Sequence, residues 1–369
     1  MFSFFHLRNF LPLLISILPF QAVSAFIDYP YAVTFQTIRL PLLPLDEDVS
    51  LENGSRWSLR LSSQWINVWS LQSNRFHIDG EEFDINPSLR YRFEDDSVFG
   101  VSLPVKSVGG GIMDDYIEGF HDAANVTQGQ RDRYPRNKFN VSYEPFAEFY
   151  PLLDGDPLFT YMRQFDLRLY PRDRLDPPIK NISNQTLTLL SEEIVNKSGD
   201  RANIGDPRIY YQKELWSGRR FIDRIHGGIQ LKVPVYTDQL LGSPGLDTGL
   251  FLVLGKKDFI PDLSWRLGIS YTHFEMVKFL SLSLPDHQWV FRPALDYTLD
   301  SEWSLSLEYL YFSAPVKHFG RLSKPGHQVS FVLMRKSENH KLVYAVVENF
   351  GNYGVTPDIG FHFSIETLQ

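Results

Sequence analysis

The ionisable residues that could do chemistry in this chain gather behind a run of three glycines, Gly109 to Gly111. Ile112, Tyr116 and Phe120 follow at four-residue spacing, which predicts a short amphipathic helix. Polar groups on its other face could bind a cation or exchange protons, although an acidic helix face is more often simply solvated. The sequence leaves open whether the surrounding loop plugs a lumen, lies on the surface or binds a ligand. The polar residues are Asp114, Asp115, Glu118 and His121.

A second set of charged residues stands at alternating positions of predicted β-strands, opposite the apolar positions. Because successive side chains of a strand point to opposite faces, these charges share one polar face. If the strands close into a barrel, that face lines the lumen. The lumen candidates are Arg168, Arg266, Arg292, Asp296 and Glu308.

The common catalytic motifs are absent from the sequence. There is neither Gly-x-Ser-x-Gly nor His-Glu-x-x-His, and the glycine run lacks the Lys and Ser/Thr of a phosphate-binding loop. The absence of cysteine excludes thiol catalysis and cysteine-ligated zinc. We therefore expect no enzyme, no metal and no cofactor. The alternative is a hydrolase that sets a Ser or Asp beside one of the ten histidines at a barrel rim.

The elements that must position these residues are strands with strict apolar and polar alternation, as in Trp303 to Tyr309 and Ile359 to Glu366. Several candidates, including 157–170, are longer than ordinary soluble strands and suit tilted membrane strands of about 9–11 residues. Trp and Tyr recur near strand ends, as in the aromatic girdles of outer-membrane barrels. The fold predicted is an all-β transmembrane antiparallel barrel of about 12 (12–14) strands, with a short helix in the 107–138 loop.

The first 25 residues have the pattern of a secretory signal peptide: a basic residue, the apolar run Phe10 to Phe20, and small residues before a cleavage site after Ala25. We expect three segments, namely the signal peptide at 1–25, a proline-rich extended segment at 26–54 and the barrel at 55–369. The predicted location is the outer membrane, after export and cleavage near Ala25.

The composition also limits the partners. The net charge is −8, with 44 acidic and 36 basic residues, which argues against nucleic acid because phosphate binding needs clustered positive charge. Aromatic residues make up 15% of the chain, as suits interface girdles. The expected partners are outer-membrane lipid and lipopolysaccharide, together with the barrel-assembly machinery during biogenesis. The cargo, if there is one, is a small molecule that the sequence does not identify.

Several motifs resemble an uncharacterised family of proteobacterial outer-membrane proteins, classed as a domain of unknown function. The resemblance covers the chain from about residue 30 to its end, and it implies transport of small hydrophobic compounds. The residues that carry it are the glycine run leading into Asp114-x-x-Ile117-Glu118-x-Phe120-His121, then Arg131 and Pro135, Gly205-Asp206-Pro207-Arg208, the Leu-Lys-x-Pro motif at 231–234 and the Gly-Ser-x-Gly-x-Asp motif at 242–247.

The function expected is that of an integral outer-membrane barrel, a channel or transporter for small solutes that include hydrophobic ones. A structural or surface-interaction barrel, its lumen filled by the 107–138 segment, is the alternative. The rim hydrolase and a soluble β-sandwich that binds carbohydrate are the remaining hypotheses.

Overall fold

The structure is a computed structural model. The predicted signal peptide, the 26–54 segment, Arg168 and the predicted strand at 157–170 lie outside the described residues. The residues described are 56–72, 76–124, 131, 134–143, 195–197, 201–218, 221–235, 241–279, 282–317, 320–337, 339–350 and 355–368.

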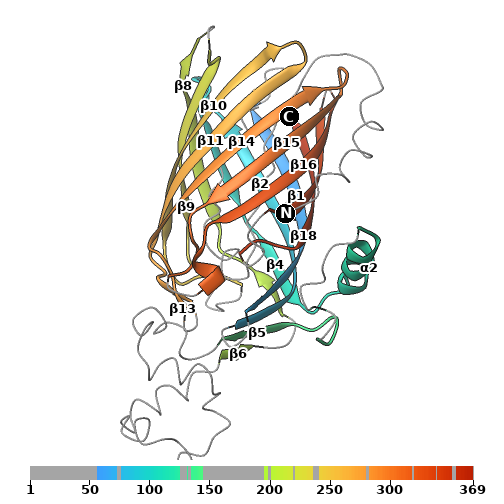
Figure 1. Cartoon of the computed structure of the whole chain (residues 1–369). Helices are drawn as coiled ribbons and strands as arrows, with labels where there is room; N and C mark the ends of the chain where they lie inside the picture. Colours follow the sequence, from blue (N-terminus) through green and yellow to red (C-terminus); the bar gives the residue numbers. More distant parts are fainter. Residues whose placement is uncertain are drawn as a thin grey trace, which may run out of the picture.

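Within the described residues, twelve antiparallel strands form a closed barrel (Figure 1). The first strand pairs with both the second and the last, so the ring has no open edge there. The predicted fold class is confirmed, including the strand number and the short helix in the 107–138 loop. The ring consists of β1 (Trp57–Gln72), β2 (Phe76–Arg92), β3 (Val98–Ser102), β8 (Arg208–Ser217), β9 (Arg224–Lys232), β10 (Asp247–Ile260), β11 (Leu263–Phe274), β14 (His287–Thr298), β15 (Trp303–Phe312), β16 (Gly326–Lys336), β17 (His340–Asn349) and β18 (Ile359–Leu368).

The burial pattern is the reverse of that in a water-soluble protein, where large apolar side chains are buried and charged ones exposed. Along β14, Trp289, Phe291 and Leu295 are 40–46% exposed, whereas Arg292 and Asp296 are 1–2% exposed. An apolar outer face and a polar inner face are what a barrel in lipid requires. The alternation therefore shows a membrane barrel and argues against the soluble β-sandwich.

Outward aromatic side chains gather near both ends of the strands. The rings of Trp57 and Tyr91 lie with centroids 4.6 Å apart close to the start of β1. At the opposite end of the barrel, the rings of Tyr271 and Trp289 are 4.8 Å apart. Two such girdles mark the two membrane interfaces, as the positions of Trp and Tyr in the sequence predicted.

The connections differ in length between the two ends of the barrel. Short turns, such as the Phe93–Ser97 and Pro261–Asp262 connections, join strands at what we call the turn end. Long connections, such as 233–246 and 275–286, gather at the loop end. Barrels of this class place short turns in the periplasm and long loops outside. The loop end is therefore assigned to the outer face of the membrane.

The wall extends at the loop end, where β2 continues past β3. Successive stretches of β2 pair with β3, then with β4 and β5, while β7 pairs with β4 and β6 pairs with β5. Pro104, which separates β3 from β4, and Pro207, which separates β7 from β8, cannot donate to the ladder. The smaller elements are β4 (Val105–Gly109), α2 (Asp114–Ala124), β5 (Asn140–Tyr143), β6 (Val195–Lys197), β7 (Arg201–Ile204), β12 (Lys278–Phe279), β13 (Leu282–Ser283) and η6 (Gly320–Ser323).

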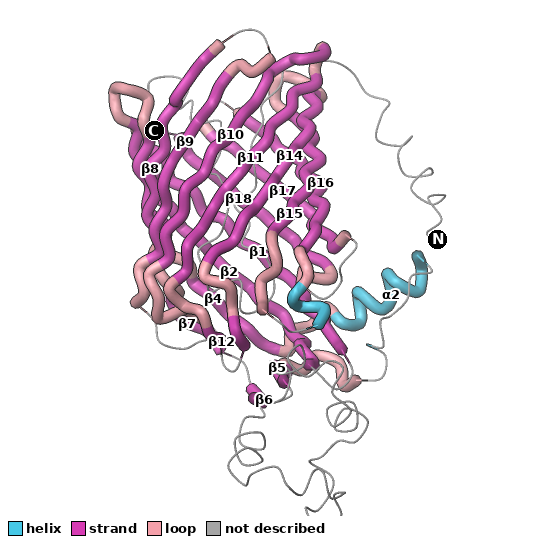
Figure 2. The backbone as a smooth tube through the Cα atoms, turned by 60° about the vertical axis from the view of Figure 1, so that its left-hand side comes forward, coloured by secondary structure: helices cyan, strands magenta, loops and turns pink. Residues whose placement is uncertain are grey.

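Helix α2 lies outside the barrel wall at the loop end, in both views of the backbone (Figures 1 and 2). Ile117 of α2 and Met113, which directly precedes the helix, pack against Ile359 at the start of β18, with Trp65 and Phe361 partly covered. No helix among the described residues is both long and apolar enough to cross a membrane.

Candidate functional site in the barrel lumen

Four of the predicted lumen residues meet around one small side chain, Ala294. Arg266 on β11 and Glu308 on β15 are the direct cross-strand partners of Ala294. Arg292 and Asp296 stand two residues before and after it on β14, so they share its face. The register of three strands therefore brings together residues that span 43 positions of sequence, from 266 to 308. We call these four charged residues the lumen cluster.

The lumen cluster is internally paired. Arg266 donates to Asp296 through Nε at 2.7 Å and Nη2 at 2.6 Å, a bidentate contact. Arg292 donates through Nε to Glu308 at 3.0 Å, and the Arg266 guanidinium also lies 3.6 Å from Glu308. All four side chains are at most 2% exposed. Such charges are tolerated in a buried site because each one has an opposite charge beside it.

A second inner network crosses the seam where the barrel closes. Arg60 on β1 is the cross-strand partner of Glu366 on β18, and its Nη2 lies 2.9 Å from the carboxylate. Arg90 on β2 also contacts Glu366, and it donates to Ser58 at 2.9 Å. One carboxylate thus joins the first, second and last strands, so the ion pairs reinforce the closure made by the backbone ladder.

A third network lies on the inner face nearer the loop end. Lys106 is the cross-strand partner of Asp84 and lies 3.4 Å from that carboxylate, with Glu82 at 3.3 Å. Gln64 also donates to Asp84, at 2.9 Å. These residues were not predicted as a group, since β3 and β4 read in sequence as one strand across Pro104.

A fourth network explains the Leu-Lys-x-Pro and Gly-Ser-x-Gly-x-Asp motifs of the sequence as a loop anchor. Lys232 Nζ lies 3.2 Å from Asp206 and 3.6 Å from Asp247, and it donates at 2.7 Å to both Ser243 Oγ and the Gly245 carbonyl. Asp206 in turn accepts from the Ser243 amide at 2.8 Å. One buried ammonium therefore ties three segments together, which supports the interpretation of 242–247 as a structural loop.

Part of the inner wall is apolar. Phe251 and Val253 on β10 pack with Ala294, beside the lumen cluster. Phe251 lies over Gly228, its cross-strand partner, where an added Cβ would come within 2.3 Å of the ring. Phe312 lies over Gly326 in the same way. The glycines let these rings approach the wall closely, an arrangement that also fixes strand register.

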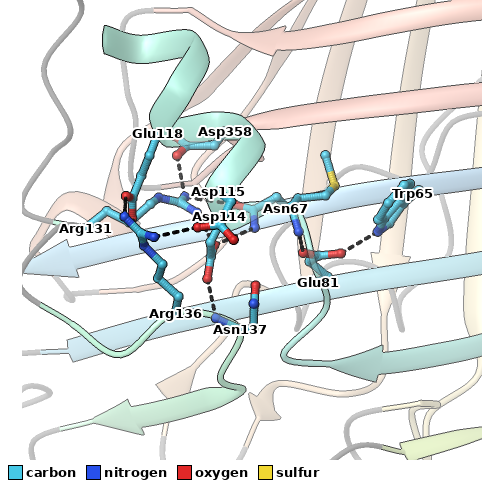
Figure 3. Close-up of polar contacts among 11 residues, drawn as sticks. Trp65, Asn67, Glu81, Asp114, Asp115, Glu118, Arg131, Arg136, Asn137 and Asp358 are labelled. Atoms are coloured by element: carbon cyan, nitrogen blue, oxygen red, sulfur yellow. Dashed lines mark hydrogen bonds and ion pairs between the residues drawn. The ribbon is translucent and has the colours of Figure 1, made fainter.

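The predicted helix residues lie outside the lumen. Asp114 accepts from Arg131 at 2.6 Å, whereas Asp115 and Glu118 bind Arg136 (Figure 3). His121 lies on the same external helix. The hypothesis that the 107–138 segment fills the lumen is therefore wrong for its described part. The physical reason is that the glycine turn directs the chain over the outer surface of β1, β2 and β18.

That outer surface carries its own polar group, which we call the anchor cluster. Arg131 binds Asp114, and its Nη2 donates to Asn67 at 2.8 Å and to Asp358 at 2.6 Å (Figure 3). Glu81 accepts from the Met113 amide, and from the Trp65 indole at 2.6 Å. The anchor cluster consists of Asn67, Glu81, Asp114, Arg131 and Asp358.

Neither cluster resembles a metal or catalytic centre. Over the described ranges, no group of three or more His, Asp or Glu side chains is placed so that it could hold a metal ion. Asp114, Asp115 and Glu118 of α2 face arginine guanidinium groups instead. Their arrangement fixes a helix, and it offers no open coordination sphere.

Residues 19–148 and 185–367 match a family model described as a protein of unknown function (DUF3187). No curated protein matches the chain. A COG4313 outer membrane channel from Pseudomonas putida F1 is similar in structure over 88% of this chain and 98% of its own, with a TM-score of 0.51 and 11% identity. The similarity to the NanC porin covers 85% of this chain and 99% of that one, with a TM-score of 0.40 and 6% identity. The similarity to the Pseudomonas putida toluene transporter TodX covers 93% of this chain and 98% of that one, with a TM-score of 0.38 and 9% identity. At these identities the likeness shows the fold, that of an outer-membrane β-barrel.

Proposed function

Because the chain belongs to the DUF3187 family and folds as an outer-membrane β-barrel, we propose that it is a narrow channel for small solutes of low net charge, hydrophobic ones included. The observation that carries this proposal is the pairing of charges inside the barrel, centred on the lumen cluster. Export with cleavage near Ala25 is part of the same proposal, since a barrel reaches this membrane from the periplasm.

The four inner networks nearly cancel in charge. The seam network holds two arginines and one glutamate, so it has one positive charge in excess. Each lysine network holds one lysine and two carboxylates, so each has one negative charge in excess. The lumen cluster balances, with two arginines and two carboxylates. Arg208 and Lys341 are two further buried cations at inward positions, so the buried inner charges among the described residues are eight positive and seven negative. A pathway with so small a net charge has no strong reason to favour cations or anions.

The inner wall also offers apolar surface for a small hydrophobic solute. Phe251, Val253 and Ala294 form a patch beside the lumen cluster. Binding sites for small molecules typically combine apolar walls with a few placed polar groups. The similar solved structure is that of an outer membrane channel, and its likeness in fold is compatible with this role.

Removal of the pair Arg292 and Glu308 tests whether the lumen is a pathway. We expect R292A/E308A in a planar bilayer to conduct more than the unchanged protein, because two long side chains that narrow the lumen are shortened. The matched control is D95N, in the exposed turn between β2 and β3, which should leave conductance unchanged. If neither the unchanged protein nor R292A/E308A conducts, the channel proposal fails.

A structural barrel with a filled lumen is the second candidate. It is favoured by the complete burial of Arg266 and Arg292, each at most 2% exposed inside the barrel. The conductance measurement separates the two, because a purely structural barrel gives no current in any variant.

A further inference from the structure

The apolar side of α2 is wider than the contact it makes with the barrel. Met113 and Ile117 are each 2% exposed against the wall. Tyr116 and Phe120 on α2 are instead 58% and 49% exposed, and Ile112, which precedes the helix and was expected from its spacing to belong to it, is 71% exposed. We call these three residues the apolar stripe. A helix that needed only to pack on the wall would gain nothing from three further large apolar residues.

We propose that the apolar stripe of α2 lies among the acyl chains of outer-leaflet lipid, so that α2 is an interfacial helix docked on the outside of the barrel. This inference rests on the membrane placement of the barrel and is independent of the proposed channel function. The exposed stripe is therefore covered by lipid. Finding it covered by a second copy of the chain, or exposed to water, would contradict the proposal.

The stripe is continuous with the lipid-facing surface of the wall. The Tyr116 ring lies 6.5 Å from that of Phe361, at an angle of 62°, and Phe361 belongs to the outward face of β18. Phe363, two residues further on that face, is 37% exposed, as is required of a side chain in lipid. Lipid that covers Phe363 would therefore also reach Tyr116.

The height of the helix agrees with an interfacial position. Its packing partner Ile359 is the first residue of β18, so α2 lies level with the strand ends at the loop end. The loop end faces outward, which places α2 at the outer leaflet. Interfacial helices lie in the membrane plane with the apolar side towards the acyl chains and the polar side towards water.

The polar side of α2 is turned away from the stripe and fixed. Asp115 lies 2.6 Å from Arg136, and Glu118 also binds that guanidinium. The anchor cluster holds the first turn of α2 to the wall through Asp114 and Arg131 (Figure 3). These contacts set the rotation of the helix, and so they determine which side meets the membrane.

Single-cysteine spin labelling tests the proposal directly, because the native chain has no cysteine. Y116C and F120C report on the stripe. G119C is the control on the same helix, where a Cβ meets no atom within 4 Å. Each protein is folded into vesicles of phosphatidylethanolamine and phosphatidylglycerol, and the label's collision rates with oxygen and with a water-soluble nickel chelate are measured.

We expect the oxygen-to-nickel collision ratio at Y116C and F120C to exceed that at G119C several-fold, because oxygen concentrates in acyl chains and the chelate is excluded from them. Equal access of the nickel chelate to all three positions would place the stripe in water and overturn the proposal. Low access of both reagents at Y116C and F120C would show that protein covers the stripe, and would overturn it equally. Neither result depends on whether the barrel conducts.

Discussion

The lumen cluster and the anchor cluster are two buried groups of arginine and carboxylate side chains on opposite faces of the same wall. Arg266 and Arg292 pair with carboxylates on the inner face, between neighbouring strands of the ring. Arg131 pairs with Asp114 and Asp358 on the outer face, where the uncovered outward residues of the same strands are apolar, for example Leu59, Leu61 and Phe83. A polar group on the outer face of a membrane barrel therefore needs to be covered by protein, and here α2 and its flanking loop cover it.

The largest expected effect is that of R266A within the lumen cluster. It leaves Asp296 buried without its bidentate partner, and breaking a buried pair in this way costs about 3–5 kcal/mol. The free energy of unfolding, measured by urea titration of the barrel in vesicles, should fall by that amount. R266A/D296A should recover part of the loss, because it removes the stranded charge; an equal or larger loss in the double variant would contradict the pairing.

In the anchor cluster, R131A should release α2 with a smaller effect on the barrel itself. The hydrogen bonds from Arg131 to Asp114, Asn67 and Asp358 are lost, and these bonds hold the first turn of α2 to the wall. Hydrogen exchange should rise across the α2 backbone while the strands stay protected. Faster exchange in β14 to the same degree would show that the two clusters are not separate.

G111A should disturb the anchor cluster through the backbone. Gly111 has φ +64°, and an added Cβ would lie 1.8 Å from the Glu81 carboxyl carbon. Alanine is strained in that conformation, and its side chain would displace the Glu81 carboxylate, which accepts a hydrogen bond from the Met113 amide. Exchange at the first turn of α2 should rise, as in R131A. G119A, at an open position of the same helix, is the matched control and should not show this.

The smallest effect is expected from D95N in a turn outside both clusters. Hydrogen bonds from Lys213 and Ser97 hold the pKa of Asp95 well below its ordinary value. The pair is nevertheless exposed to solvent, and exposed pairs contribute little to stability. Urea titration should give no measurable change. A loss comparable with that of R266A would contradict the distinction between exposed and buried pairs.

The sequence predicted the inner face well because alternation is a local property of each strand. Arg266, Arg292, Asp296 and Glu308 stand at polar positions between apolar ones, so their shared face follows from period two alone. That they all surround Ala294 could not be predicted, because it depends on the register between three strands.

The outer face was harder to predict because a remote loop changes its environment. Asn67, Asp79 and Glu81 are buried polar residues at outward positions of β1 and β2, where alternation alone would expect lipid contact. Their polarity was the available signal that something covers this part of the wall. Helical spacing predicted α2 but carried no information about which side of the wall it would join.

If the lumen is narrow and its charges are paired to near neutrality, the ion selectivity of the channel should show it. The reversal potential of the channel is measured under a potassium chloride gradient for the unchanged protein, E308Q and R292Q. We expect weak selectivity in the unchanged protein, a shift towards anions in E308Q and a shift towards cations in R292Q, because each change leaves the partner's charge uncompensated in the lumen. Strong selectivity before any change, or no shift in either variant, would contradict it.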